Sequence, residues 1–268
     1  MAILIFPGKG GTGKTTLTAL TIKYFSEKGD IALAMDLDPD SHLHKLLGVK
    51  VSKTVGEVVD YMHKEKKMEL EPQKPIDVSN QDYFLSLIAE KVFIESENFD
   101  LLTLGKPSAD IDCYCPVFMW SNYAIASIMK SYKSTYDHIV VDCDPGTEIF
   151  PRRILHKISE YSPIDHMLIV LDSSKMSLDT AKAIVEEARK SELKVKSIRG
   201  LANRVDDPEI QKELKIVAKE KYAIEIAGFI PTDSEINKME LIGKSIFDLP
   251  KSRAYEAFSK IIKGLLGP

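Results

Sequence analysis

A glycine-rich stretch near the amino terminus carries the residue types best suited to chemistry. It reads Gly-Lys-Gly-Gly-Thr-Gly-Lys-Thr-Thr over residues 8–16 and follows the apolar run Ile3–Phe6. Glycines allow the backbone to curl around a phosphate, and the start of the following helix favours negative charge. In such a loop the lysine before the threonine reaches the β- and γ-phosphates, and that threonine binds Mg²⁺. We therefore expect a nucleotide site formed by Gly8, Lys9, Gly10, Gly11, Thr12, Gly13, Lys14, Thr15 and Thr16.

Two acidic segments follow predicted buried strands. Asp36-Leu37-Asp38-Pro39 comes after the apolar run 31–35, and Asp142-Cys143-Asp144-Pro145-Gly146 comes after 137–141. The carboxyl ends of parallel strands border the ligand crevice of an open α/β sheet, so these acids should face the bound phosphates. An aspartate that closes an apolar strand suits the second protein contact to Mg²⁺. We expect Mg²⁺ to be held by Thr15, Asp36 and Asp142, some of them through water.

The rest of the chain alternates short apolar runs with amphipathic segments. We expect further strands at 99–105, 166–171, 196–202 and 223–230, and helices at 15–27, 51–66, 82–95, 119–132, 177–190 and 252–266. Another helix should begin at Asp207-Pro208-Glu209. This alternation predicts an α/β fold with one doubly wound, mainly parallel sheet of seven or eight strands and helices on both faces. A single domain would span 1–268, with a helical and loop insertion at about 49–98, where Pro72 and Pro75 favour a loop over 69–80.

The overall composition excludes several classes of protein. The chain has 268 residues, of which 44% are hydrophobic and 28% charged, and its net charge is −4. Such a balance provides an ample core and does not favour a nucleic-acid surface. The sequence has no signal-peptide pattern and no apolar run near the roughly 20 residues of a membrane helix. The three cysteines favour a reducing compartment over a disulfide scaffold, so we expect a cytoplasmic protein. From the charge and the lack of a long apolar run, we expect neither nucleic acid nor a membrane as partner.

The early lysine of the phosphate loop points to a particular class. Together with the acidic segments 36–39 and 142–146, the sequence Lys-Gly-Gly-Thr-Gly-Lys-Thr resembles the deviant P-loop of the MinD/ParA/nitrogenase-iron-protein class of dimerising ATPases. In that class the early lysine reaches the partner's nucleotide, which implies a homodimer here. The resemblance implies catalytic roles for Lys9, Lys14, Asp38 and Asp142, with Asp38 orienting or activating the attacking water. It also implies adenine contacts from Asn203 and Arg204 and base packing by the segment that contains Pro231 and Asp233.

A pair of cysteines narrows the resemblance. Cys113-Tyr114-Cys115, in the same chain as these motifs, resembles the CooC-type nickel-insertion ATPases that mature carbon monoxide dehydrogenase. In that family the two cysteines of each subunit meet their copies across a nucleotide-linked dimer, and four thiolates hold one Ni²⁺ or Zn²⁺. The resemblance therefore implies apo carbon monoxide dehydrogenase as the client. Asp112 stands where such proteins often have glycine, and Ile149-Phe150-Pro151 also departs from the pattern.

Two other functions fit parts of the sequence. A positioning ATPase that acts on a membrane or DNA without a metal is favoured by the apolar face of the closing helix, formed by Ala254, Phe258, Ile261, Ile262 and Leu265. An ATP-dependent electron donor resembling the iron protein would hold an iron–sulfur cluster on cysteines, with Cys143 as a candidate ligand. We expect the closing helix to dock on the sheet and Cys143 to be a small core residue.

Overall fold

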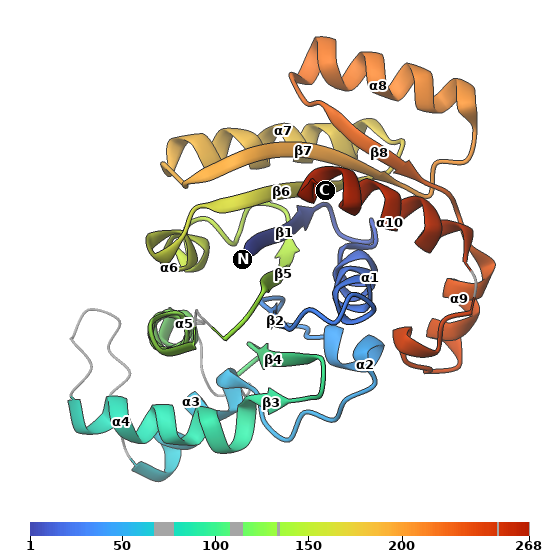
Figure 1. Ribbon diagram of the computed structural model, residues 1–268. Helices are drawn as coiled ribbons and strands as arrows, with labels where there is room; N and C mark the ends of the chain where they lie inside the picture. Colours follow the sequence, from blue (N-terminus) through green and yellow to red (C-terminus); the bar gives the residue numbers. More distant parts are fainter. Residues whose placement is uncertain (67–77, 108–114, 133–134, 251, 268) are drawn as a thin grey trace.

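The computed structural model describes residues 1–66, 78–107, 115–132, 135–250 and 252–267, and an eight-stranded sheet forms its centre (Figure 1). The strand order across the sheet is β3-β4-β2-β5-β1-β6-β7-β8, and every pairing is parallel except that of β3 with β4. The strands are β1 (Ala2–Gly8), β2 (Ala32–Asp36), β3 (Ile94–Glu95), β4 (Phe99–Thr103), β5 (His138–Pro145), β6 (Ile164–Leu171), β7 (Val195–Asn203) and β8 (Ile226–Ile230). The predicted mainly parallel α/β sheet is confirmed.

Helices cover both faces of this sheet (Figure 1). Apolar side chains of α1, α2, α9 and α10 form the core on one face, and those of α3 to α8 form the core on the other. The central strand β1 is buried on both sides, with Leu4 and Phe6 in the first core and Ile3 and Ile5 in the second. The helices are α1 (Lys14–Ser26), α2 (Leu43–Leu47), α3 (Val55–Lys66), α4 (Val78–Leu87), α5 (Cys115–Tyr132), α6 (Ile154–Tyr161), α7 (Lys175–Lys190), α8 (Pro208–Tyr222), α9 (Ser234–Leu241) and α10 (Arg253–Leu266), with a π turn η1 (Ile88–Val92) and a 3₁₀ turn η2 (Ile246–Asp248).

The region expected to be an insertion differs most from its sequence prediction. The helix expected at 82–95 is instead α4, η1 and the short edge strand β3, because Phe93 turns extended and the chain pairs antiparallel with β4. The helix expected at 51–66 begins only at Val55. Of the loop expected at 69–80, residues 69–77 lie outside the described residues and 78–80 belong to α4.

Other boundaries shifted for local reasons. The helix expected at 119–132 begins at Cys115, so this cysteine belongs to a helix and not to the loop before it. The strand expected at 223–230 begins at Ile226, because Ala223 takes a left-handed conformation as the cap of α8. The helices α6 and α9 were not predicted. Among the helices of the described ranges, none combines the length and apolar character needed to cross a membrane.

The strand order places the phosphate loop at a topological switch point. β1 lies between β5 and β6, and the chain leaves β1 to form β2 on the far side of β5. Ligands of open α/β sheets bind where the strand order changes direction, beyond the carboxyl ends of the strands. Both the loop after β1 and the acids that end β2 and β5 lie at that edge.

Candidate nucleotide-binding site

The loop between β1 and α1 forms a cradle that only small residues permit. A Cβ atom at Gly8 would lie 2.5 Å from the carbonyl oxygen of Val170 on β6. Gly13 has φ 94° at the start of α1, and a Cβ there would lie 2.4 Å from Nδ2 of Asn203. Lys14 is the first residue of α1, and no acid lies in the first turn. The N–H groups at the start of α1, the helix dipole and the lysine together make this a site for an anion such as a nucleotide phosphate.

Two buried carboxylates lie side by side beneath the cradle. β2 and β5 pair in a register that sets Asp36 opposite Asp142, and their exposed fractions are 0% and 1%. The Asp36 carboxylate accepts the N–H groups of Asp38 at 3.3 Å and Leu43 at 3.1 Å. Asp142 accepts the Thr18 hydroxyl at 3.4 Å, while its Oδ2 atom has no partner within the described ranges. A buried carboxylate oxygen without a partner is well suited to bind a cation.

The electrostatics of this pair also favour a cation. Burial raises the pKa of Asp142 to about 7, although a hydrogen bond from Thr15 and the charge of Lys14 oppose the rise. Burial raises the pKa of Asp36 well above its ordinary value, and the charge of Asp142 adds to this effect. Oxygen ligands of this kind, a threonine hydroxyl and one or two carboxylates, fit Mg²⁺, which takes its other ligands from phosphates and water. Thr15, Asp36 and Asp142 therefore offer suitable oxygen ligands, and their binding of Mg²⁺ stays a prediction.

Asp38 is placed in the turn after β2. Its Oδ1 accepts the N–H of Asp40 at 2.9 Å, and its carbonyl accepts the N–H of Ser41 at 2.9 Å. The side chain is half-buried, and its charge raises the pKa of both Asp36 and Asp142. Asp38 thus offers a partly solvated carboxylate close to the buried pair, and its role in activating water stays a prediction.

Lys9 rests against its own subunit in this structure. Its ammonium lies 3.6 Å from Oδ2 of Asp172, just after β6, and both side chains are about one-third exposed, at 31% and 36%. Its carbonyl accepts the Thr12 hydroxyl at 2.9 Å, which stabilises the turn of the loop. An ion pair exposed to this degree holds the lysine only weakly at the rim of the cradle, and the reach of Lys9 to a partner's nucleotide stays a prediction.

The residues predicted to read the base tie β7 to the phosphate loop. Asn203 donates its Nδ2 hydrogen to the carbonyl of Thr12 at 2.8 Å, and Arg204 donates to the carbonyl of Gly11 at 3.4 Å. A small pocket opens beside them, lined by Thr16, Leu17, Leu20, Asn203, Arg204, Ile230, Pro231, Asp233, Ile236, Asn237 and Ala254. The structure therefore brings all four predicted base contacts together.

Asp233 has a different task from its neighbours in that pocket. Its carboxylate caps α9 through the N–H of Glu235 at 2.9 Å. The same group accepts the Ser252 hydroxyl at 2.7 Å and the N–H of Ala254 at 3.0 Å. These bonds occupy both carboxylate oxygens and join the starts of α9 and α10, so the side chain shapes the pocket wall.

The cysteines lie in contrasting surroundings. Cys115 is exposed at the start of α5, whereas Cys113 lies outside the described residues. Cys143 is fully buried in β5, and burial together with the charge of Asp144 raises the pKa of its thiol. Within the ranges that the structure describes, no group of three or more histidine, cysteine or acidic side chains is arranged to hold a metal ion.

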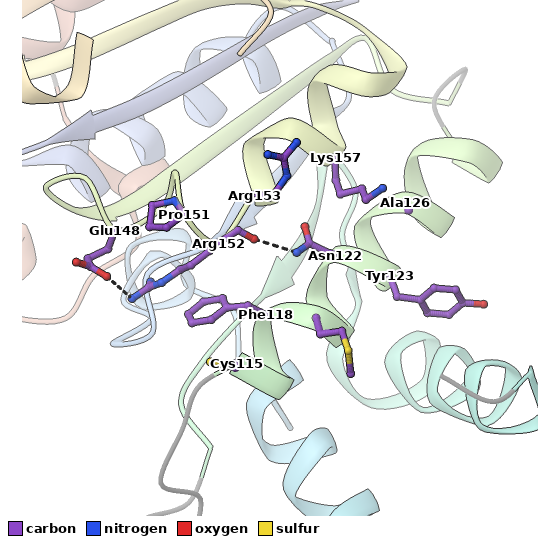
Figure 2. A pocket seen from close by; sticks show the side chains of 11 residues that line it. Cys115, Phe118, Asn122, Tyr123, Ala126, Glu148, Pro151, Arg152, Arg153 and Lys157 are labelled. Atoms are coloured by element: carbon purple, nitrogen blue, oxygen red, sulfur yellow. Dashed lines mark hydrogen bonds and ion pairs between the residues drawn. The ribbon is translucent and has the colours of Figure 1, made fainter. Parts of the chain in front are cut away.

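A groove of about 780 Å³ runs from Cys115 between α5 and α6 (Figure 2). Arg152 lies at its head and pairs with the buried carboxylate of Asp144, an interaction that sequence reasoning missed. The sequence could have identified Asp144 as a site residue, because it lies two residues after Asp142 and therefore on the same face of β5. No sequence pattern could have identified Arg152 as its partner, since Arg152 follows an irregular segment.

Comparison with known proteins relates the chain to one family of nucleotide-binding proteins. The sequence profile of the family described as CobQ/CobB/MinD/ParA nucleotide binding domain matches residues 3–246. An uncharacterised ATP-binding protein of Methanocaldococcus jannaschii is 35% identical over 97% of this chain and 95% of its own length. The carbon monoxide dehydrogenase accessory protein CooC of Rhodospirillum rubrum is 25% identical over 90% of this chain and 88% of its own. The structure of the septum site-determining protein MinD from Pyrococcus horikoshii, complexed with Mg-ADP, superposes with a TM-score of 0.65 at 22% identity, covering 99% of this chain and 97% of that one.

Proposed function

Because the chain belongs to the CobQ/CobB/MinD/ParA nucleotide-binding family, and is thereby a P-loop ATPase, we propose that it works as a dimeric metallochaperone. In this proposal the ATPase carries one metal ion, Ni²⁺ or Zn²⁺, between two subunits. The client is a metalloenzyme, with apo carbon monoxide dehydrogenase as the leading candidate.

The nucleotide half of the proposal is supported by the site itself. Lys14 and the loop N–H groups would bind the phosphates, and Thr15 and Asp142 would hold Mg²⁺, which neutralises phosphate charge. The Mg-ADP bound by the Pyrococcus horikoshii protein supports this cofactor. Asp38 would orient the attacking water, and Lys9 would leave Asp172 to reach the partner's nucleotide. Asn203 and Arg204 would hold the adenine.

The metal half rests on Cys115 above all. The Cys115 sulfur is disulfide-bonded in this structure, and its side chain is exposed at the amino-terminal end of an 18-residue helix. In the reduced protein the helix dipole would favour the negative charge of a metal-binding thiolate at this position. Cys113 is two residues away, so two subunits would supply four thiolates, a set that suits tetrahedral zinc and also accepts nickel. The similarity to CooC supports nickel and the client enzyme.

Metal analysis tests this proposal directly. The reduced protein, loaded with Ni²⁺ or Zn²⁺ in the presence of ADP or a non-hydrolysable ATP analogue, should hold about one metal per dimer. The double variant Cys113→Ser/Cys115→Ser should lose it, and Cys143→Ala, which removes only the buried thiol, should retain it. Metal bound equally by the double variant would refute the metal site, as would a protein that stays monomeric when loaded.

The positioning ATPase is the main alternative, since MinD and ParA share the family and the fold. Its sequence support was the closing helix. The structure docks that helix on the sheet, with Phe258 and Ile262 at 0% exposure and Ile261 against Gly228 of β8. Only its polar side, including Lys260 and Lys263, is exposed. Strong ATP-dependent sedimentation with anionic vesicles, lost on removing residues 252–268 from a protein that stays folded, would favour this alternative.

The electron-donor alternative has less support. Cys143 is fully buried within β5, so its thiol is not exposed to bind a cluster in this conformation. Iron and acid-labile sulfide in the purified protein would be needed to revive this function.

A further inference from the structure

Arg152 contacts three separate parts of the chain at the head of the groove (Figure 2). Its guanidinium donates to the carboxylate of Asp144 at the end of β5 and lies 3.5 Å from the carboxylate of Glu148. The same group stacks over the ring of Phe118 on α5, 4.1 Å from the ring centre. Its backbone carbonyl accepts the side-chain N–H of Asn122, also on α5, at 3.0 Å. One residue thus holds the segment after β5 against the first two turns of α5.

The segment held in this way begins at the nucleotide site. It continues directly from β5, which carries Asp142, and the N–H of Gly146 donates to the carbonyl of Gly8 in the phosphate loop at 3.0 Å. A Cβ atom at Gly10 would lie 3.8 Å from Cβ of Pro145, so the segment and the loop are in close contact. Gly146 has φ 77°, a conformation that lets the chain reverse without strain. A change in the phosphates held by the loop would therefore act on this segment.

The other end of the connection is the cysteine helix. Phe118 lies three residues after Cys115, so its ring and the side chain of Cys115 lie on the same side of the first turn of α5. Both side chains line the same groove as Arg152. A rigid helix transmits a displacement of Phe118 to Cys115 with little loss, because packed elements move as units.

We propose that Arg152 is a positioning residue that couples the nucleotide state of the phosphate loop to the position of Cys115. The path runs from Gly8 and Gly146 through Asp144 to Arg152, and from Arg152 through Phe118 to the start of α5. The inference rests on the proposed function only in treating Cys115 as the thiol that the ATPase controls. Exchange of ATP for ADP would alter the metal cage through this path without any contact between nucleotide and metal.

A simpler role is also open to Arg152, namely neutralising the buried carboxylate of Asp144. That role affects folding stability and does not depend on nucleotide. A measurement that compares two nucleotide states within each variant therefore separates the two roles, because a purely structural loss affects both states alike.

The test is the rate at which iodoacetamide alkylates Cys115 in the full chain carrying Cys113→Ser, under reducing conditions and followed by mass spectrometry. The rate is compared between Mg-ADP and a magnesium-bound, non-hydrolysable ATP analogue. We expect the two rates to differ by about 5-fold or more, the lower range of known couplings between sites. With Arg152→Gln the ratio should fall to near one, while ATP affinity stays within about threefold of the parent value.

Two further variants complete the design. Arg153→Gln removes the same charge one residue away, from an exposed side chain on the same groove, and should keep the parent ratio. Phe118→Leu leaves the pair with Asp144 intact but removes the ring, and it should lower the ratio even if Arg152→Gln does not fold. A parent ratio near one, or a full ratio in both Phe118→Leu and folded Arg152→Gln, would overturn the proposal.

Metal analysis of the protein that keeps both cysteines, run in parallel, distinguishes the two proposals. If the protein with both cysteines binds no metal through them while the alkylation ratio still depends on Arg152, the metallochaperone function fails and the coupling stands. If metal binds at about one per dimer but its affinity and the alkylation rate ignore the nucleotide, the coupling fails and the metal function stands.

Discussion

Replacing Asp142 with asparagine should stabilise the protein that lacks nucleotide and magnesium. Asp142 is 1% exposed and has a carboxylate oxygen without a partner in the described part of the chain, so its ionisation in the folded state is costly. Its pKa rises from 3.8 to about 7 on folding. A carboxyl group with a raised pKa contributes most stability below its unfolded pKa and loses that contribution as the pH rises through the folded pKa.

The size of the effect follows from the two pKa values. Each unit of difference corresponds to about 1.4 kcal/mol, so full ionisation of Asp142 costs the folded state about 4 kcal/mol. Between about pH 5 and pH 8 this cost grows by roughly 2 to 3 kcal/mol. Asparagine cannot ionise, so its advantage over aspartate should grow by at least this amount over that interval, because the neighbouring Asp36 also loses the repulsion from the Asp142 charge. This pH-dependent part does not depend on how the asparagine packs.

The assay is urea unfolding in EDTA, without nucleotide, at about pH 5, 6.5 and 8, with the free energy of unfolding taken from linear extrapolation. Asp248→Asn, which removes the same charge from an exposed position, should change stability by less than about 0.5 kcal/mol at every pH. Adding Mg-ADP should stabilise the wild type much more than Asp142→Asn. A difference between wild type and Asp142→Asn that stays constant with pH would refute the reasoning.

Three more substitutions test other parts of the structure. Lys14→Ala should weaken ATP binding about 10- to 100-fold in titration calorimetry, because it removes a charged contact to the phosphates; unchanged affinity would contradict that contact. Asp233→Ala should lower the free energy of unfolding by about 2 kcal/mol, against about 1 kcal/mol for Asp207→Ala, because Asp233 also accepts from Ser252 and Ala254 besides capping its helix. Equal losses in urea unfolding would argue against those added bonds. Phe258→Ala should cost about 3–5 kcal/mol by leaving a cavity under α10, and a loss below about 1 kcal/mol would mean that α10 does not dock in solution.

The chemistry of the phosphate site could be predicted without any structure. The order strand, glycine-rich loop, helix lies within residues 3–26, and each step depends on neighbouring residues: glycines for the turn, a lysine and a threonine at the start of the helix. The apolar runs that end in Asp36 and Asp142 are equally local signals. The alternation of such runs with amphipathic segments was sufficient to predict the parallel α/β sheet.

Helix ends and the edge of the sheet were less predictable. The start of α5 at Cys115 and the short strand β3 depend on what packs against them, since their own residues fit a helix, a loop or a strand about equally well. Asp233 was expected to contact the nucleotide base, but an aspartate at this position is equally suited to cap a helix, and in the structure it caps α9. Only the placement of Ser252 and Ala254 beside it shows where its carboxylate oxygens are engaged.

The sequence by itself therefore determined the chemical parts of this protein: a phosphate cradle, acids that end buried strands, and two closely spaced cysteines. The tertiary structure decided which parts meet. Asp36 lies beside Asp142 because β2 pairs with β5, and Arg152 joins Asp144 to Phe118 because α6 and α5 pack on the same face of the sheet. Turns and periodicity are set by near neighbours, whereas strand order and long-range contacts are set by which faces bury one another, and no short stretch of residues carries that information.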